Sequence, residues 1–163
     1  MVVQNPNTPD ANQLALLKKK LQLEAKIRNG VGWFYWIAGL SIINTLAYLF
    51  GTTFTFVIGL GATQVVDGVM AAFAKNLGGS WSALRIVGLA IDICIAGVFV
   101  LFGVLGRKRM RWPIITGMVL YAIDGVILLV FKDFLGAAFH VWALWGIWVG
   151  LKAIKELGVL EKS

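Results

Sequence analysis

Apolar residues fill most of this chain in four long runs that charged residues seldom interrupt. The runs cover residues 31–50, 85–106, 112–131 and 134–152. A helix needs about 20 mainly apolar residues to cross the hydrocarbon core of a bilayer, and each run has about that length. The pattern therefore predicts an all-α polytopic membrane protein, in which residues 31–152 form a bundle of four transmembrane helices.

The segment between the first two runs, residues 51–84, is apolar but less regular. Its stretch 54–74 is long enough to span a membrane, yet it contains Gln64, Asp67 and several glycines. Irregular backbone is not tolerated in contact with lipid, so we expect a short helix near 61–75 that lies on the membrane or re-enters it from outside. A fifth span is the alternative.

The two ends of the chain differ from the runs in being polar or amphipathic. Residues 1–30 predict a separate basic helix, with Thr8 as N-cap, Pro9 as the first helical residue and Gly30 as the stop. Such a helix lies on an anionic membrane surface or packs against a partner. No apolar signal-peptide core precedes the first run, so we expect that run to be retained. Residues 153–163 are expected to form a tail.

The charges orient the four runs. The chain is 59% hydrophobic with a formal net charge of +7. With four spans, all Lys and Arg residues except Lys75, Arg85 and Lys132 lie on one side. Basic residues favour cytoplasmic loops, which predicts a plasma (inner) membrane protein with both termini cytoplasmic. Because topology explains the excess positive charge, nucleic acid is not expected as a partner, whereas the lipid bilayer is.

Polar residues within the runs lie at similar depths. Asn44, Asp92, Asp124 and His140 are each six or seven residues from the outer end of their run. At 1.5 Å per residue, all four lie about 9–10 Å below the outer surface. An ionisable group inside a membrane span normally faces the bundle interior, so we expect these side chains to converge in an outward-facing pocket.

Other polar side chains are placed to join this layer. On the first run, four of them share one helical face: Ser41, Asn44, Thr45 and Tyr48. Tyr121 lies one turn inward from Asp124, and Asp67 with Gln64 in the external segment could cover the layer. The candidate ligand- or ion-binding residues are therefore Asn44, Asp67, Asp92, Tyr121, Asp124 and His140.

Several kinds of chemistry fit this layer. Two carboxylates in proximity oppose joint ionisation, so either one is protonated or a cation lies between them. Asp92, Asp124 and His140 could also hold a divalent metal ion, the one cofactor that these residue types suggest. Alternatively, Arg85 and Lys132 neutralise the acids from the rim, or the layer only joins helices by hydrogen bonds.

Three functions follow from these alternatives. The leading one is binding of a proton, a cation or a small polar ligand in the pocket. The second is an accessory subunit of a larger membrane complex or a homo-oligomer, with a purely structural polar layer. The third is a metal-dependent membrane hydrolase with Asp67 as base, although the absence of HExxH, GxSxG and P-loop motifs makes an enzyme the less favoured class.

Overall fold

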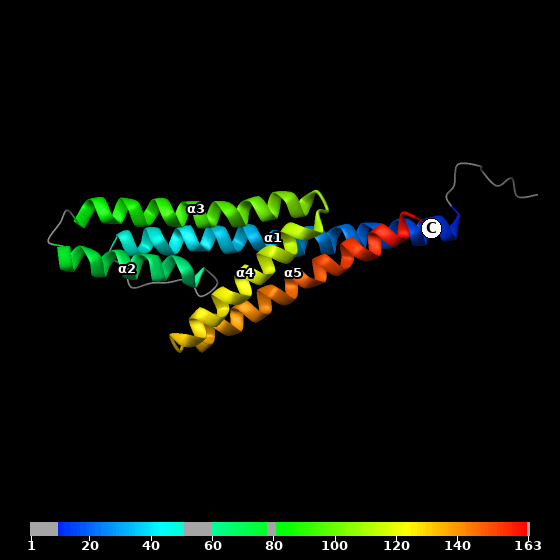
Figure 1. The fold of residues 1–163 in the computed structure, drawn as a ribbon. Coiled ribbons are helices and arrows are strands. Elements are labelled where there is room, and N and C mark those ends of the chain that lie inside the picture. The colour runs from blue at the N-terminus through cyan, green and yellow to red at the C-terminus, as the bar shows by residue number, and fades with distance from the viewer. Residues whose placement is uncertain (1–9, 51–59, 78–80, 163) are drawn as a thin grey trace, which may run out of the picture.

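Five α-helices make up the structure, a computed structural model that describes residues 10–50, 60–77 and 81–162 (Figure 1). They are α1 (Ala11–Leu49), α2 (Gly61–Leu77), α3 (Trp81–Arg107), α4 (Arg111–Val130) and α5 (Phe134–Leu160). No strand is present in these ranges. All except α2 are long and apolar enough to cross a membrane, which confirms the predicted all-helical fold with four candidate spans. The predicted N-cap Thr8, the following Pro9 and residues 51–59 lie outside the described residues.

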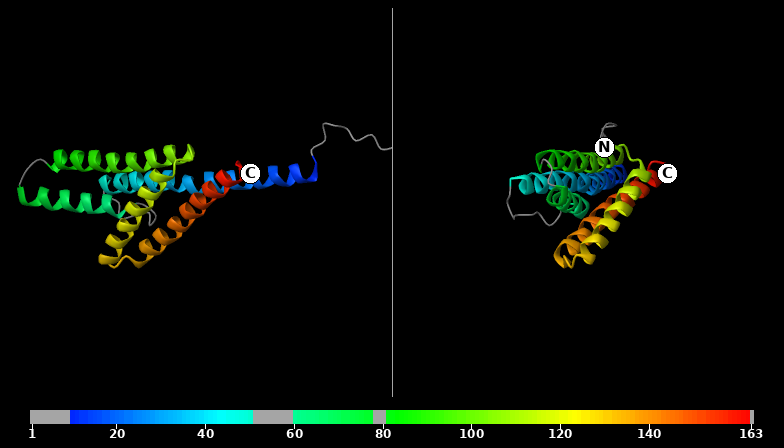
Figure 2. Two further views of the ribbon diagram at one scale, coloured as in Figure 1. Left: turned by 45° about the vertical axis from the view of Figure 1, so that its right-hand side comes forward. Right: turned by 60° about the vertical axis from the view of Figure 1, so that its left-hand side comes forward.

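Helix α1 lies at the centre of the bundle. It packs along α3 on one side and along α5 on another, while α4 and α5 form a hairpin that crosses the other helices at an angle (Figures 1 and 2). The shorter α2 runs beside α3. Aromatic rings fill the contact between α1 and α3, where Phe34 meets Phe99 and Phe102 in tilted and edge-on arrangements.

Helix α1 does not stop at Gly30, contrary to the prediction of a separate N-terminal helix. It continues for 39 residues as one element. Gly30 instead faces two glycines of α5, Gly146 and Gly150, which are four residues apart. A Cβ atom at Gly30 would lie 2.6 Å from the Cα atom of Gly150. Because neither Gly30 nor Gly150 has a side chain, the backbones of α1 and α5 can approach closely at this point. The glycine that resembles a stop signal is therefore a packing residue.

The first part of α1 and the last part of α5 pack together. Leu23 and Ile27 of α1 are buried, as are Ile154 and Leu157 of α5. Helix α5 thus continues through most of the segment 153–163 that was expected to be a tail. Beyond this contact, the first turns of α1 reach past the end of α5 (Figure 2). We call residues 11–21 the projecting arm; its Leu14, Leu17 and Leu21 are exposed.

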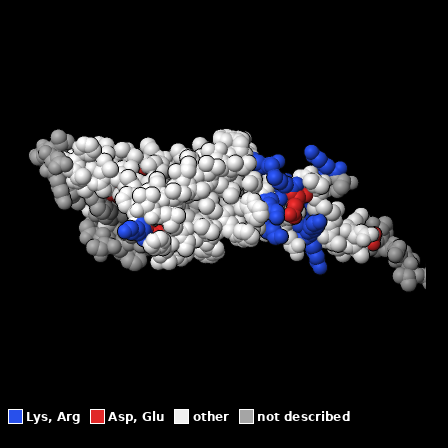
Figure 3. Space-filling model, turned by 60° about the horizontal axis from the view of Figure 1, so that its bottom comes forward, with Lys and Arg blue, Asp and Glu red and all other residues white. Residues whose placement is uncertain are grey.

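Lys and Arg side chains gather at one end of the bundle (Figure 3). We call it the basic end; it comprises the turn 107–111 between α3 and α4 together with the C-terminal part of α5. Arg109 in this turn forms ion pairs with Glu24 of α1 at 3.1 Å and with Glu161 at 2.8 Å. These side chains are nearly half exposed, so each pair contributes at most about 1 kcal/mol. The opposite end contains the turn between α4 and α5.

The close contact of α1 with α5 can be tested by adding one methyl group. We expect Gly30→Ala to lower the free energy of unfolding by about 1–3 kcal/mol, because the new Cβ would force the helix backbones apart. Gly39→Ala in the same helix is the matched control, since a Cβ there meets no atom within 4 Å. Thermal unfolding in detergent measures both; equal stability of the two variants would contradict the packing role of Gly30.

Candidate functional site

Asp124 of α4 and His140 of α5 form a buried pair. His140 Nε2 lies 2.8 Å from Asp124 Oδ2, and His140 Nδ1 lies 2.8 Å from the carbonyl oxygen of Gly136. A carbonyl only accepts, so Nδ1 carries a proton. A second proton must lie between Nε2 and the carboxylate, because two bare lone pairs would repel. The pair therefore holds that proton jointly and is neutral overall, which suits its burial.

Packing fixes the orientation of the His140 ring. Tyr121 of α4 stacks on it with ring centroids 4.0 Å apart and an interplanar angle of 17°. Gly125, one turn after Tyr121 on α4, also lies against this residue, and a Cβ there would come within 3.1 Å of the His140 Cβ. Tyr121 is fully buried, so the predicted polar residue acts here as a flat packing surface for the imidazole.

Asp124 also caps the first turn of α2. Its Oδ2 accepts a hydrogen bond from the Gly61 N–H at 2.8 Å, and its Oδ1 accepts one from the Ala62 N–H at 2.7 Å. The first N–H groups of a helix have no partner within the helix, and their dipoles favour a nearby negative charge. A carboxylate from a distant helix therefore provides the cap that α2 lacks in its own sequence.

Ser41 of α1 holds the residue before this turn. Its hydroxyl accepts from the Leu60 N–H at 2.7 Å and donates to the Ile37 carbonyl at 2.7 Å. Leu60 is buried, and Thr63 donates to its carbonyl at 2.8 Å. Side chains from α1 and α4 thus hold the start of α2, and His140 of α5 is paired with one of them, Asp124.

A second polar cluster joins α1, α2 and α3. Asp92 of α3 is fully buried, and its Oδ2 accepts from the Thr45 hydroxyl at 2.9 Å. No N–H or hydroxyl of the described chain reaches its Oδ1. The carboxyl of Asp67 on α2 is near enough to Asp92 for the two acids to influence each other electrostatically. Two carboxyl groups this near each other oppose joint ionisation.

Burial raises the pKa of Asp67 from its ordinary value of 3.8 to about 6, although the interaction with Asp92 opposes this shift. Asp67 lies on α2, which is not one of the four candidate spans. Its carboxyl faces Gly88 of α3, where a Cβ would lie 3.8 Å from Oδ1 and 3.3 Å from the Met70 side chain. A larger residue at this position would therefore crowd Met70 more than the acid.

The predicted layer is therefore divided into two clusters. Asp124 and His140 meet as expected, whereas Asp92 pairs with Thr45 and Asp67 instead. Asn44 is buried on α1 between the residues that serve the two clusters, and Gln64 is exposed. Lys132 is exposed in the turn between α4 and α5; the side chains of Tyr48, Lys75 and Arg85 lie outside the described residues.

The expected metal ligands are split by this division. Among the residues that the structure describes, no group of three or more His, Cys, Asp or Glu side chains is arranged to hold a metal ion. A pocket of about 330 Å³ between α3 and α4 reaches Asp124, but its other lining residues, such as Phe99 and Ile123, are apolar. Such a pocket offers nothing to a polar ligand beyond a carboxylate that is already occupied.

Sequence reasoning missed the backbone partners of Asp124. One signal was available, because the helix that starts at Gly61 follows Leu60, whose side chain cannot act as an N-cap. A buried helix start without a local cap needs an acceptor from elsewhere. Gly61 also leaves room for the contact, since a Cβ there would lie 2.7 Å from the side chain of Leu128.

Comparison of the chain with protein-family models, with curated proteins and with solved structures found no match.

The capping role of Asp124 predicts a local and a global effect. In Asp124→Asn an amide donor replaces one oxygen and faces another donor, so we expect stability to fall by about 3 kcal/mol or more. Asp133→Asn is the control, because Asp133 caps α5 near the surface by accepting from the Gly136 N–H and should cost only about 1 kcal/mol. Hydrogen exchange should accelerate at Gly61 and Ala62 in the first variant alone; unchanged exchange there would exclude the cap.

The raised pKa of Asp67 predicts how stability varies with pH. The folded protein binds more protons than the unfolded chain between about pH 4 and pH 6, so the free energy of unfolding should fall as pH rises through that window. The fall attributable to Asp67 is up to about 3 kcal/mol. Denaturation in detergent at a series of pH values measures it. Asp67→Asn should flatten the profile while Glu161→Gln retains it; a profile that Asp67→Asn leaves unchanged would contradict the assignment.

Proposed function

We propose that this chain is a small integral protein of the plasma (inner) membrane that binds a proton between Asp67 and Asp92. In this proposal α1, α3, α4 and α5 span the bilayer and both termini are cytoplasmic. Two observations support that topology: four helices have the length and composition of spans, and Lys and Arg gather at one end. The positive-inside rule assigns the basic end to the cytoplasm.

The observation that carries the proposal is that two buried carboxyl groups from different helices, Asp67 and Asp92, lie near enough to influence each other. Asp92 has one oxygen on Thr45 and another that no N–H or hydroxyl of the described residues reaches. The Asp67 carboxyl is the neighbouring acid, and because close carboxylates oppose joint ionisation, a proton shared by the two would stabilise the pair. A proton satisfies this geometry without further ligands, whereas a divalent metal ion would need several more oxygen or nitrogen atoms around it.

The other cluster supports the same assignment by contrast. The oxygens of Asp124 accept two backbone N–H groups and face His140 Nε2. This carboxylate is saturated with donors, so we assign Asp124 and His140 to holding α2 in place. Asp92 and Asp124 thus have different roles because their donors differ.

A proton at this position would control how tightly α2 packs. Helix α2 is held at its start by Asp124 and Ser41, and farther along by the carboxyl pair with α3. Loss of the shared proton leaves two carboxylates in contact, and their repulsion favours separation of α2 from α3. The proposed function is therefore reversible proton binding, coupled to the position of α2 on the outer side.

Infrared spectroscopy tests the proposal directly. We expect a protonated carboxyl band in wild-type protein at pH 5 that disappears by pH 8 and is absent from Asp67→Asn. Asp133→Asn, which removes a partly exposed acid, should retain the band. Complete ionisation at pH 5 in the wild type would refute proton binding. A different result would assign the site to a cation instead. In that case the protonated carboxyl band would be absent, and Na⁺ or K⁺ at pH 8 would raise the thermal stability of the wild type but not of Asp92→Asn.

An accessory subunit of a larger membrane complex is the second candidate. The observation in its favour is the projecting arm, which exposes Leu14, Leu17 and Leu21 at i, i+3 and i+7 on one helical face. For this function the polar clusters only fix helix packing. Finding every carboxylate ionised at pH 5 would favour this candidate over proton binding.

A further inference from the structure

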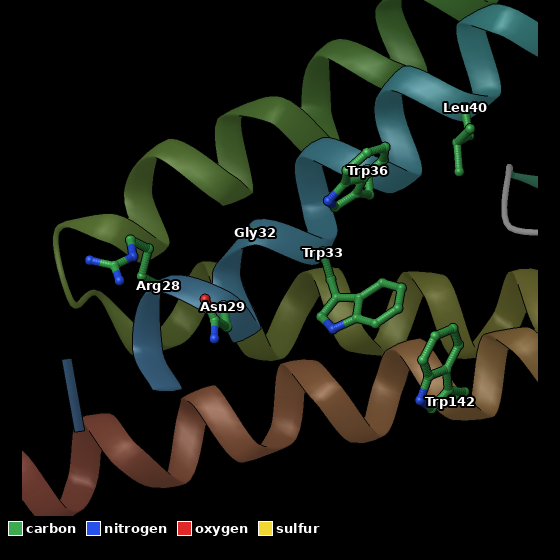
Figure 4. A pocket seen from close by; sticks show the side chains of 7 residues that line it. All are labelled: Arg28, Asn29, Gly32, Trp33, Trp36, Leu40 and Trp142. Carbon is green, nitrogen blue, oxygen red and sulfur yellow. The ribbon is translucent and has the colours of Figure 1, made fainter. Parts of the chain in front are cut away.

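A pocket of about 400 Å³ lies beside α1, with lining residues that begin near the basic end. Its lining comes from one side of α1 and from Trp142 of α5 (Figure 4). From the basic end toward the middle of the bundle, the α1 residues follow in this order: Arg28, Asn29, Gly32, Trp33, Trp36 and Leu40.

The polarity of this pocket changes along its length. Two lining residues, Arg28 and Asn29, have charged or amide side chains, and they are adjacent at the end of the pocket nearest the basic end. All the other lining residues are tryptophan, leucine or glycine. Arg28 and Leu40 are separated by about 18 Å along the helix. A ligand that fits this gradient has a compact anionic group at one end and a hydrocarbon chain at the other.

The chemistry at the polar end favours a phosphate. A guanidinium group donates several hydrogen bonds in a geometry that matches phosphate oxygens, and the Asn29 amide can add another. Within the described part of the chain no carboxylate forms an ion pair with Arg28, because Glu24, one turn earlier, is paired with Arg109. The charge of Arg28 is therefore available to an external anion.

The apolar part is shaped by tryptophans. Trp33 and Trp142 meet edge to face with ring centroids 5.0 Å apart, which forms a rigid wall between α1 and α5. Gly32 leaves the adjacent surface hollow, since a Cβ there would meet no atom within 4 Å. Trp36 is 67% exposed, and its indole nitrogen lies on the side of the ring toward Arg28 (Figure 4). Tryptophan is typical of the depth at which head groups meet acyl chains.

We propose that this pocket binds one anionic phospholipid of the inner leaflet, with its phosphate at Arg28 and Asn29 and an acyl chain along Gly32, Trp36 and Leu40. The inference rests on the membrane location in the proposed function, but not on the proton site. A failure here would leave the carboxyl pair of Asp67 and Asp92 untouched, and the reverse also holds.

Native mass spectrometry of full-length protein from mixed micelles tests this site, with dioleoylphosphatidylglycerol and dioleoylphosphatidylcholine as probes. We expect wild type to retain one phosphatidylglycerol in preference to phosphatidylcholine. Arg28→Gln should weaken the retained phosphatidylglycerol about fivefold, since one cation near a lipid head group is worth about 1 kcal/mol. Arg111→Gln removes an exposed charge from the same end of the bundle and should change retention less than twofold.

A second pair of variants tests the acyl part of the site. Trp36→Ala should weaken retention of both lipids, whereas Trp112→Ala, which removes a similarly exposed tryptophan of α4, should not. All four positions are exposed, so thermal unfolding should show that the variants fold. Equal losses in Arg28→Gln and Arg111→Gln, equal losses in the two tryptophan variants, or equal retention of the two lipids by wild type would each overturn the proposal.

Discussion

The structure depends on one buried carboxylate that closes the start of a helix from a different part of the chain. Asp124 is 63 residues from Gly61, yet its oxygens take the N–H groups that α2 leaves unpaired. Without that acceptor, a helix could not begin in the interior of an apolar bundle, because each bare N–H would carry its full desolvation cost. Three neighbouring residues support this function. His140 shares a proton with the Asp124 carboxyl, while Tyr121 and Gly125 pack against His140 and hold its imidazole in place.

The same constraint explains why the two acids in the candidate spans, Asp92 and Asp124, differ in chemistry. The backbone donors of α2 make Asp124 a permanent structural acceptor. Asp92 meets a hydroxyl and another carboxyl, and neither can neutralise it without a proton. Asp92 and Asp124 occupy similar positions along their helices. The difference in their hydrogen-bond partners therefore arises from which part of a neighbouring helix lies against each carboxyl group. Helix α2 covers both, with its backbone at one place and with Asp67 at the other.

Periodicity and composition predicted most of the fold. The four long apolar runs correspond to the four candidate spans, and the short helix near 61–75 is present as α2. The similar depth of Asp124 and His140 predicted their contact. Gly30 misled because a glycine that ends a helix and one that permits close packing look the same in sequence, and only the partner glycine on α5 distinguishes them. The backbone caps and the pairing of Asp67 with Asp92 were beyond prediction, since they depend on which helix lies beside which.

The unbroken length of α1 has a mechanical consequence. Ser41 and Thr45 touch both polar clusters near one end of this helix, and the projecting arm is its other end. About 30 residues of continuous helix, about 45 Å, separate Ser41 from the tip of this arm at Ala11. A straight helix of this kind behaves as a lever whose fulcrum is the glycine contact with α5. The tip lies about 28 Å from that contact, so a tilt of about 5° would displace it by about 2 Å, without any hinge in between.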